Sequence, residues 1–204
     1  TGKAIYTDDI SEPKNLLHAV IGYSNCSKGV IKKIDYKDVL SSEGVVDIIT
    51  EKDIEGINDV GPIFKGDKIF TSKNIEYYGQ PIFAVIAKTN NLAKKAALKV
   101  KIDLKISKPI VSIEEALKKK SFVLKPKHLT RGNIKDGFKK SDNILKGKLY
   151  SGGQDHFYLE GQIAMTIPQE DNNFLVYSST QHPSETQQII GKVLKQNYNS
   201  IHVI

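Results

Sequence analysis

The residues best suited to chemistry lie together in one short segment, residues 151–162, which reads Ser-Gly-Gly-Gln-Asp-His-Phe-Tyr-Leu-Glu-Gly-Gln. Gly152 and Gly153 lack a Cβ atom, so the backbone there can adopt positive φ values and can lie close against another group. The side chain of Gln154 offers two N–H donors and one acceptor without carrying charge. It can therefore donate to an electron-rich oxygen, such as a metal oxo group, without competing as a metal ligand.

The same segment has a plain structural alternative. A Gly-Gly pair also forms the tight turn of a β-hairpin, and the polar residues after it can simply face water. The pattern alone therefore leaves both the turn and the binding site open.

Other polar residues near this segment are weaker candidates. Glu160 could serve as a catalytic acid, but an ion pair or a cap that holds the Gly-Gly-Gln segment in place is the favoured interpretation. His156 and His182 lack partners for a metal site, because no two histidines have the i, i+4 spacing of a zinc-binding helix. His156 is interpreted as support behind the site. Gln181 fits either a cofactor-facing loop or a strand-to-helix turn.

Composition excludes several classes of protein. With 39% apolar and 26% charged residues over 204 positions, the chain has a soluble, globular composition, and a cytoplasmic location is expected. No run approaches the roughly 18 apolar residues of a membrane span. Cys26 is the single cysteine, which excludes an internal disulfide and a cysteine-based metal site. We expect Cys26 to be buried.

The net charge of +7 raises the question of nucleic-acid binding. The basic residues are scattered lysines, and Arg131 is the one arginine. Proteins that recognise bases and phosphates specifically usually do so with arginine. Proteins that bind single strands place aromatic residues among the basic ones. Neither pattern is present, so no nucleic-acid partner is expected.

The first hundred residues alternate between apolar strands and short helices, which indicates an α+β or α/β domain. Residues 82–87 form an almost unbroken apolar run that predicts a central strand, and Gln80 is expected to order its entrance. The sequence further predicts strands over 16–23, 30–34, 45–50 and 100–106, helices over 36–40 and 91–99, and a capped helical turn at 50–53.

The second half has a different pattern. A capping box at Ser112 predicts a helix, whereas residues 121–138 lack sustained periodicity and are interpreted as a crossing linker. Strands are predicted over 143–150, 162–168, 174–179 and 201–204, and Pro183 is expected to begin a helix through about residue 195. A chain that starts without methionine and stops within a strand is expected to be part of a longer protein.

Four stretches together resemble a known family. Residues 2–10, 78–82, 152–161 and 179–183 have the order and approximate spacing found in the molybdenum subunit of xanthine dehydrogenases. The likeness is greatest to the bacterial form, in which this subunit is a separate chain. The resemblance implies an α+β fold in which residues 1–107 form an α/β hammerhead domain and 108–129 a linker. Residues 130–204 would then begin the molybdopterin-binding domain.

The resemblance also implies a function. The family oxidises purines, from hypoxanthine to xanthine to urate, with water as the oxygen donor. A molybdenum–molybdopterin cofactor would be bound, and electrons would pass to 2Fe-2S clusters and FAD on a partner chain or domain and then to NAD. Gln154 matches the family's glutamine beside the molybdenum oxo group, and Gly152 and Gly153 would contact the cofactor with it.

Departures from the family pattern limit what is carried over. The family has a glutamate where this chain has Asp155, so Asp155 is assigned no catalytic task. The glycine-rich pterin loop, the substrate-orienting residues and the catalytic base are expected beyond residue 204, so this stretch alone is expected to be inactive. Two alternatives remain, namely an aldehyde oxidase-like hydroxylase and a non-catalytic relic that packs with partner subunits.

Overall fold

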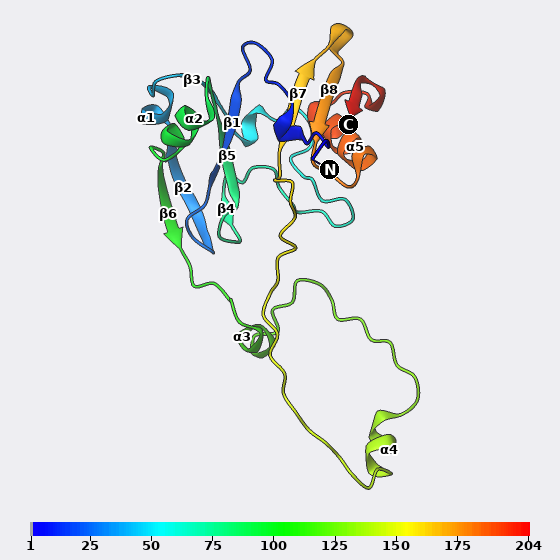
Figure 1. Cartoon of the computed structure of the whole chain (residues 1–204). Helices are drawn as coiled ribbons and strands as arrows, with labels where there is room; N and C mark the ends of the chain where they lie inside the picture. Colours follow the sequence, from blue (N-terminus) through cyan, green and yellow to red (C-terminus); the bar gives the residue numbers. More distant parts are fainter. Residues whose placement is uncertain (1) are drawn as a thin grey trace. The chain divides into compact units, whose positions relative to one another are not determined.

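The computed structural model describes residues 2–204, which divide into two compact units (Figure 1). One unit contains residues 2–109 together with 160–204, and the other contains residues 110–159. The first unit combines three small sheets with helices. This mixture of elements confirms the predicted α+β fold class.

The first sheet is built around the predicted central strand. Strand β5 (Pro81–Ala87) lies between β1 (His18–Tyr23) and β3 (Val45–Ile49), and both neighbours are antiparallel to it. Phe83 in β5 is fully buried. Its ring occupies the space beside Gly22 of β1, where a Cβ atom would lie 2.2 Å from the ring carbons. A side chain at position 22 would therefore displace the Phe83 ring from this place in the core.

The second sheet has the order β4-β2-β6 and is entirely antiparallel. Its strands are β2 (Gly29–Asp35), β4 (Asn74–Ile75) and β6 (Lys101–Ile106). The two-residue strand β4 is absent from the sequence prediction because two residues carry no periodicity. The 3-10 helix η2 (Glu51–Asp53) follows β3, and the hydroxyl of Thr50 accepts the Lys52 N–H at 3.3 Å, which confirms the predicted capped turn.

Two short helices pack against the first sheet, namely α1 (Lys37–Leu40) and α2 (Asn90–Ala97). Thr89 caps α2 by accepting the Leu92 N–H at 3.2 Å, and Ala93 and Ala96 are buried on its inner face. The core beneath contains an edge-to-face pair, Tyr36 and Phe83, with ring centroids 5.2 Å apart. Burial, with a contribution from the charge of Asp53, raises the pKa of Tyr36 to about 12.

The third sheet joins β7 (Ala164–Pro168), β8 (Phe174–Ser178) and β9 (Ile201–Val203). Strands β7 and β8 form an antiparallel hairpin, whereas β9 is parallel to β8. Helix α5 (Pro183–Leu194) provides the crossover between β8 and β9, and Pro183 occupies its first turn as predicted. Three further 3-10 helices are η1 (Thr7–Asp9), η3 (Glu170–Asn172) and η4 (Tyr198–Ser200).

The unit of residues 110–159 contains helices α3 (Ile113–Lys118) and α4 (Ile134–Lys139). The hydroxyl of Ser112 accepts the Glu115 N–H at 3.2 Å, which confirms the predicted cap of α3. Helix α4 was not predicted. Its N-cap is Asn133, whose side chain accepts two backbone N–H groups of the first turn.

The strand predicted over 143–150 is wrong, since this stretch is irregular and pairs with no other strand of the described chain. Large apolar side chains in the same unit, such as Leu145 and Leu149, are almost completely exposed. Alternating apolar residues form a strand when a partner strand and a core are present, and residues 110–159 provide neither.

Candidate functional site

The Gly-Gly-Gln segment lies in the irregular part of residues 110–159. Gly152, Gly153 and Gln154 are all exposed, and no hairpin turn forms at the glycine pair. A Cβ atom at either glycine would meet no atom of a distant residue within 4 Å. The Gln154 amide makes no hydrogen bond to another described residue. The hairpin interpretation is therefore wrong, and both the carbonyl oxygen and the NH2 group of the Gln154 side-chain amide are available to a ligand.

The backbone has an unusual conformation three residues after Gln154. Phe157 has a φ of 52°, in the left-handed region that bulky residues rarely adopt. Phe157 is 92% exposed, and Leu159 is 87% exposed. His156, the predicted support, is also exposed.

The end of the segment is held to the start of the chain. The carboxylate of Glu160 accepts the backbone N–H of Thr7 at 3.1 Å, in a partly buried contact that spans 153 residues of sequence. Glu160 thus acts as a cap, in keeping with the interpretation favoured from sequence. The group it caps is the first turn of η1, and the contact is a hydrogen bond to the backbone.

A second attachment follows three residues later. The Ile163 N–H donates to Ser179 Oγ at 3.0 Å, and the Ser179 hydroxyl and N–H donate to the Ile163 carbonyl at 3.2 and 3.1 Å. Ile163 immediately precedes β7 and Ser179 follows β8. Residues 160–163 are therefore fixed at both ends.

These two attachments connect three of the four stretches that carry the family resemblance, namely residues 2–10, 152–161 and 179–183. Figure 1 shows the N-terminal segment (blue) beside the start of β7. Gln181 and His182 are exposed in the turn that leads into α5, where His182 occupies the N-cap position. This arrangement favours the strand-to-helix turn interpretation for Gln181.

The fourth stretch, residues 78–82, has a structural role. Gln80 is buried, its side-chain oxygen accepts the Glu76 N–H at 2.8 Å, and its own N–H donates to Ser24 Oγ at 3.2 Å. The Ser24 N–H in turn donates to the Gln80 carbonyl at 2.9 Å. Gln80 therefore orders the entrance to β5, as the sequence predicted.

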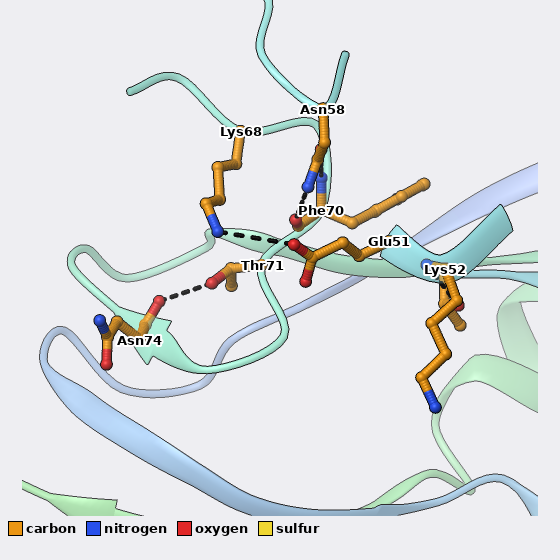
Figure 2. Close-up of polar contacts among 8 residues, drawn as sticks. Glu51, Lys52, Asn58, Lys68, Phe70, Thr71 and Asn74 are labelled. Carbon is orange, nitrogen blue, oxygen red and sulfur yellow. Dashed lines mark hydrogen bonds and ion pairs between the residues drawn. The ribbon is translucent and has the colours of Figure 1, made fainter. Parts of the chain in front are cut away.

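A polar network between η2 and β4 was missed at the sequence level. Figure 2 shows Glu51 directed toward Lys68, with the charged groups 3.6 Å apart, and Asn58 directed toward Phe70. The Asn58 side chain donates to the Phe70 carbonyl at 2.8 Å and accepts its N–H at 3.1 Å. A hydrogen bond from Ser72, together with Lys68 and Asn58, lowers the pKa of Glu51. A lone asparagine and glutamate carry no periodic signal from which such a network could be predicted.

Metal-ligating side chains do not gather anywhere in residues 2–204, where no group of three or more His, Cys, Asp or Glu could hold an ion. The donor chemistry of residues 152–154 fits a different arrangement, in which a cofactor supplies its own metal ligands. A neutral amide and two glycines with open surroundings can approach such a group closely without binding the metal. No helix of the described chain is long and apolar enough to cross a membrane.

Solved structures share this fold. The aldehyde oxidoreductase from Desulfovibrio gigas matches over 95% of this chain and 23% of its own, with a TM-score of 0.81 and 24% identity. Quinoline 2-oxidoreductase from Pseudomonas putida 86 matches over 97% of this chain and 27% of its own, with a TM-score of 0.82 and 18% identity. At these identities the likeness establishes the fold alone.

Curated relatives are more similar in sequence. Xanthine dehydrogenase from Dictyostelium discoideum is 36% identical over 201 residues, which are 98% of this chain and 15% of that protein. Aldehyde oxidase 1 from Bos taurus is 37% identical over 204 residues, with the same two coverages. The chain thus spans about 15% of the length of these relatives.

Two family profiles match the chain. Residues 114–204 match the molybdopterin cofactor-binding domain, which includes the Gly-Gly-Gln segment. Residues 1–108 match the α/β hammerhead domain of aldehyde oxidase and xanthine dehydrogenase. Because the hammerhead profile alone covers more than half of the sequence, the chain belongs to the aldehyde oxidase and xanthine dehydrogenase family of molybdenum hydroxylases.

Proposed function

We propose that this chain is part of a xanthine dehydrogenase-type enzyme that oxidises hypoxanthine to xanthine and xanthine to urate, with water as the oxygen donor. The observation that supports this proposal most directly is the exposed, neutral Gln154. It follows two glycines with open surroundings, within the stretch that matches the molybdopterin cofactor-binding profile.

In this proposal the bound molybdenum–molybdopterin supplies the redox chemistry. Gln154 would hold the cofactor by donating an amide N–H toward its oxo group, because a neutral donor can stabilise negative charge there without binding the metal. Gly152 and Gly153 allow the backbone to lie close to the cofactor, since any side chain would occupy that space. The protein thus contributes positioning and electrostatics to chemistry that belongs to the cofactor.

The remaining parts of the enzyme follow from the same proposal. The substrate-orienting residues, the base and the rest of the molybdenum subunit would come from sequence beyond residue 204. Electrons would pass to 2Fe-2S clusters and FAD on a partner chain or domain and then to NAD. We propose a cytoplasmic location for this assembly and a hammerhead domain over residues 1–107 joined by 108–129 to the cofactor-binding domain.

A second candidate function is aldehyde oxidation by the same type of enzyme. The relevant observation is that identity to the bovine aldehyde oxidase, at 37%, is within one percentage point of that to the slime-mould xanthine dehydrogenase, at 36%. Residues 2–204 contain none of the positions expected to recognise a purine. Substrate preference must therefore be measured.

In the first experiment the native complex is isolated by affinity capture of this chain. Xanthine-dependent NAD reduction and molybdenum content are then measured in the same sample. Xanthine turnover with bound molybdenum supports the proposal. Molybdenum with turnover of aldehydes and not of xanthine favours the aldehyde-type alternative. A complex that lacks molybdenum and oxidises neither substrate favours the non-catalytic relic.

The second experiment tests the role of Gln154. In the full complex, Gln154→Ala should keep the fold and lower the turnover number by roughly 100-fold, the typical effect of removing one oriented donor. Gln169→Ala is the matched control, because it removes the same amide from an exposed loop before η3. Wild-type turnover in Gln154→Ala would exclude a role for this amide beside the cofactor.

A further inference from the structure

We propose that Glu160 is a positioning residue for Gln154. It acts by fixing the C-terminal side of the segment that contains Gly152, Gly153 and Gln154 to the backbone of Thr7. The proposal rests on the role assigned above to Gln154. Its structural basis is the 3.1 Å hydrogen bond from the Thr7 N–H to the Glu160 carboxylate.

The donor in this contact is held by its own turn. In η1 the Asp9 N–H donates to the Tyr6 carbonyl at 3.0 Å, and the Tyr6 N–H donates to the Asp9 carboxylate at 3.0 Å. The Thr7 N–H belongs to the first turn, where backbone N–H groups have no acceptor inside a helix. Glu160 supplies that acceptor, so the Thr7 N–H, which has no partner within the turn, is hydrogen-bonded.

Charge attraction does not explain a glutamate at this position. Asp8 and Asp9 lie in the same short turn, and their negative charges disfavour a third carboxylate nearby. The useful property of Glu160 is therefore its acceptor oxygen at the correct distance. A glutamine, which has the same length and an amide oxygen, should replace it.

The contact limits how far Gln154 can move. Six residues separate the two positions, and an extended chain covers at most about 3.5 Å per residue, so Gln154 lies within about 21 Å of Glu160. If the Glu160 contact is lost, the next fixed point is Ile163, held by Ser179. The distance that Gln154 can move from its nearest fixed point then grows by about 10 Å, because three more residues are free. A donor that must meet one cofactor oxygen would lose its orientation as the segment gains this freedom.

The test compares Glu160→Ala and Glu160→Gln in the full-length protein within its native complex. Exchange of the Thr7 amide hydrogen reports the contact itself. Chymotrypsin cleavage after Phe157, Tyr158 or Leu159 reports the order of the segment, and turnover reports the consequence for chemistry. Glu170→Ala is the control, because it removes one exposed carboxylate from the loop between β7 and β8.

We expect Glu160→Ala to accelerate Thr7 exchange and cleavage within 157–159 by about 3- to 10-fold, the range that corresponds to one lost hydrogen bond. Turnover should fall with molybdenum content unchanged, and Glu160→Gln should restore all three readouts. Unchanged exchange and cleavage in Glu160→Ala would overturn the proposal. Failure of Glu160→Gln to restore them would do so as well, because it would assign the effect to charge.

Two further results separate the possible failures. If the wild-type complex oxidises neither xanthine nor aldehydes, the proposed function fails, while exchange and cleavage still decide whether Glu160 orders the segment. If Glu160→Ala does not fold, Thr7→Pro tests the same contact from its donor side, because it removes the N–H that donates to Glu160. It should release residues 157–159 to chymotrypsin to a similar degree, and wild-type cleavage in that variant would contradict the positioning model.

Discussion

The backbone N–H of Gly56 donates to the carbonyl oxygen of Val193 at 2.8 Å, and the next residue, Ile57, donates to the carbonyl of Lys192 at 3.1 Å. The last carbonyls of a helix have no partner within it. In α5 the Gly191 carbonyl is satisfied by residues just after the helix, and the loop after η2 satisfies the next two. A loop in the stretch that matches the hammerhead profile thus completes the end of a helix in the stretch that matches the molybdopterin cofactor-binding profile.

This contact requires glycine at position 56. A Cβ atom there would lie 1.9 Å from the Lys192 carbonyl oxygen and 2.5 Å from that of Val193. Gly56→Ala must therefore push the loop away from α5, at a cost of about 1–3 kcal/mol for overpacking. The expected result is a melting temperature lowered by several degrees, at about 2–4 °C per kcal/mol, with faster exchange of the Ile57 amide.

The control for this variant is Gly137→Ala. Gly137 lies inside helix α4, and an added Cβ would meet no other atom within 4 Å. Alanine is favoured over glycine in a helix by up to about 1 kcal/mol, so this variant should be neutral or slightly stabilising. Equal melting temperatures for Gly56→Ala and the wild type would show that the loop and α5 separate without cost.

The donor side of the Thr7–Glu160 contact gives a separate prediction. Proline is tolerated at the first position of a helical turn, and Tyr6 before it already has the extended backbone that proline requires. Thr7→Pro therefore removes the N–H donor with little other change. We expect it to accelerate chymotrypsin cleavage within 157–159 as much as Glu160→Ala does.

The double variant decides whether the two changes act through one hydrogen bond. Thr7→Pro combined with Glu160→Ala should be cleaved no faster than either single variant, because the contact is already lost in each. Thr7→Ser keeps the N–H and serves as the control. Effects of the two single variants that multiply in the double variant would show that Thr7 and Glu160 act independently.

The central features of the fold could be predicted from the sequence because they depend on local patterns. The apolar run of β5, the caps at Thr89 and Ser112 and the proline at the start of α5 are each visible within a few residues. Helix α4 was missed because Gly137 interrupts its short pattern. Residues 143–150 have a suitable pattern for a strand but no partner, and pairing cannot be deduced from one stretch alone.

The candidate site also has features that could be predicted from the sequence and features that could not. The donor chemistry of Gln154 follows from its residue type and its two glycines, so it could be proposed from sequence. The partner of Glu160 could not, because Thr7 is 153 residues away and contributes a backbone N–H that any residue except proline would offer. The contact of Gly56 with α5 is likewise between backbone groups. Long-range contacts between backbone groups do not depend on residue type, so only the glycine at position 56 could indicate this one in the sequence.

The Glu51 network gives a prediction about acid stability. Hydrogen bonds from Ser72, the nearby charge of Lys68 and a contact with Asn58 hold the pKa of Glu51 below its usual value near 4.5. A carboxylate with a lowered pKa in the folded state stabilises the fold at pH values above the unfolded pKa. That stabilisation is lost as the pH falls through the lower, folded value.

Replacement of Glu51 by glutamine should therefore flatten the acid side of the stability profile. Glu51→Gln lacks the titrating group, so its unfolding midpoint in urea should change less than that of the wild type as the pH falls below about 4.5. The two proteins should differ most at neutral pH, where the charged carboxylate of the wild type keeps its hydrogen bond with Ser72 and its ion pair with Lys68. Glu43→Gln, at an exposed position, removes the same charge and controls for net charge. If it flattens the profile as much as Glu51→Gln does, the effect comes from total charge and the network of Figure 2 contributes nothing to acid stability.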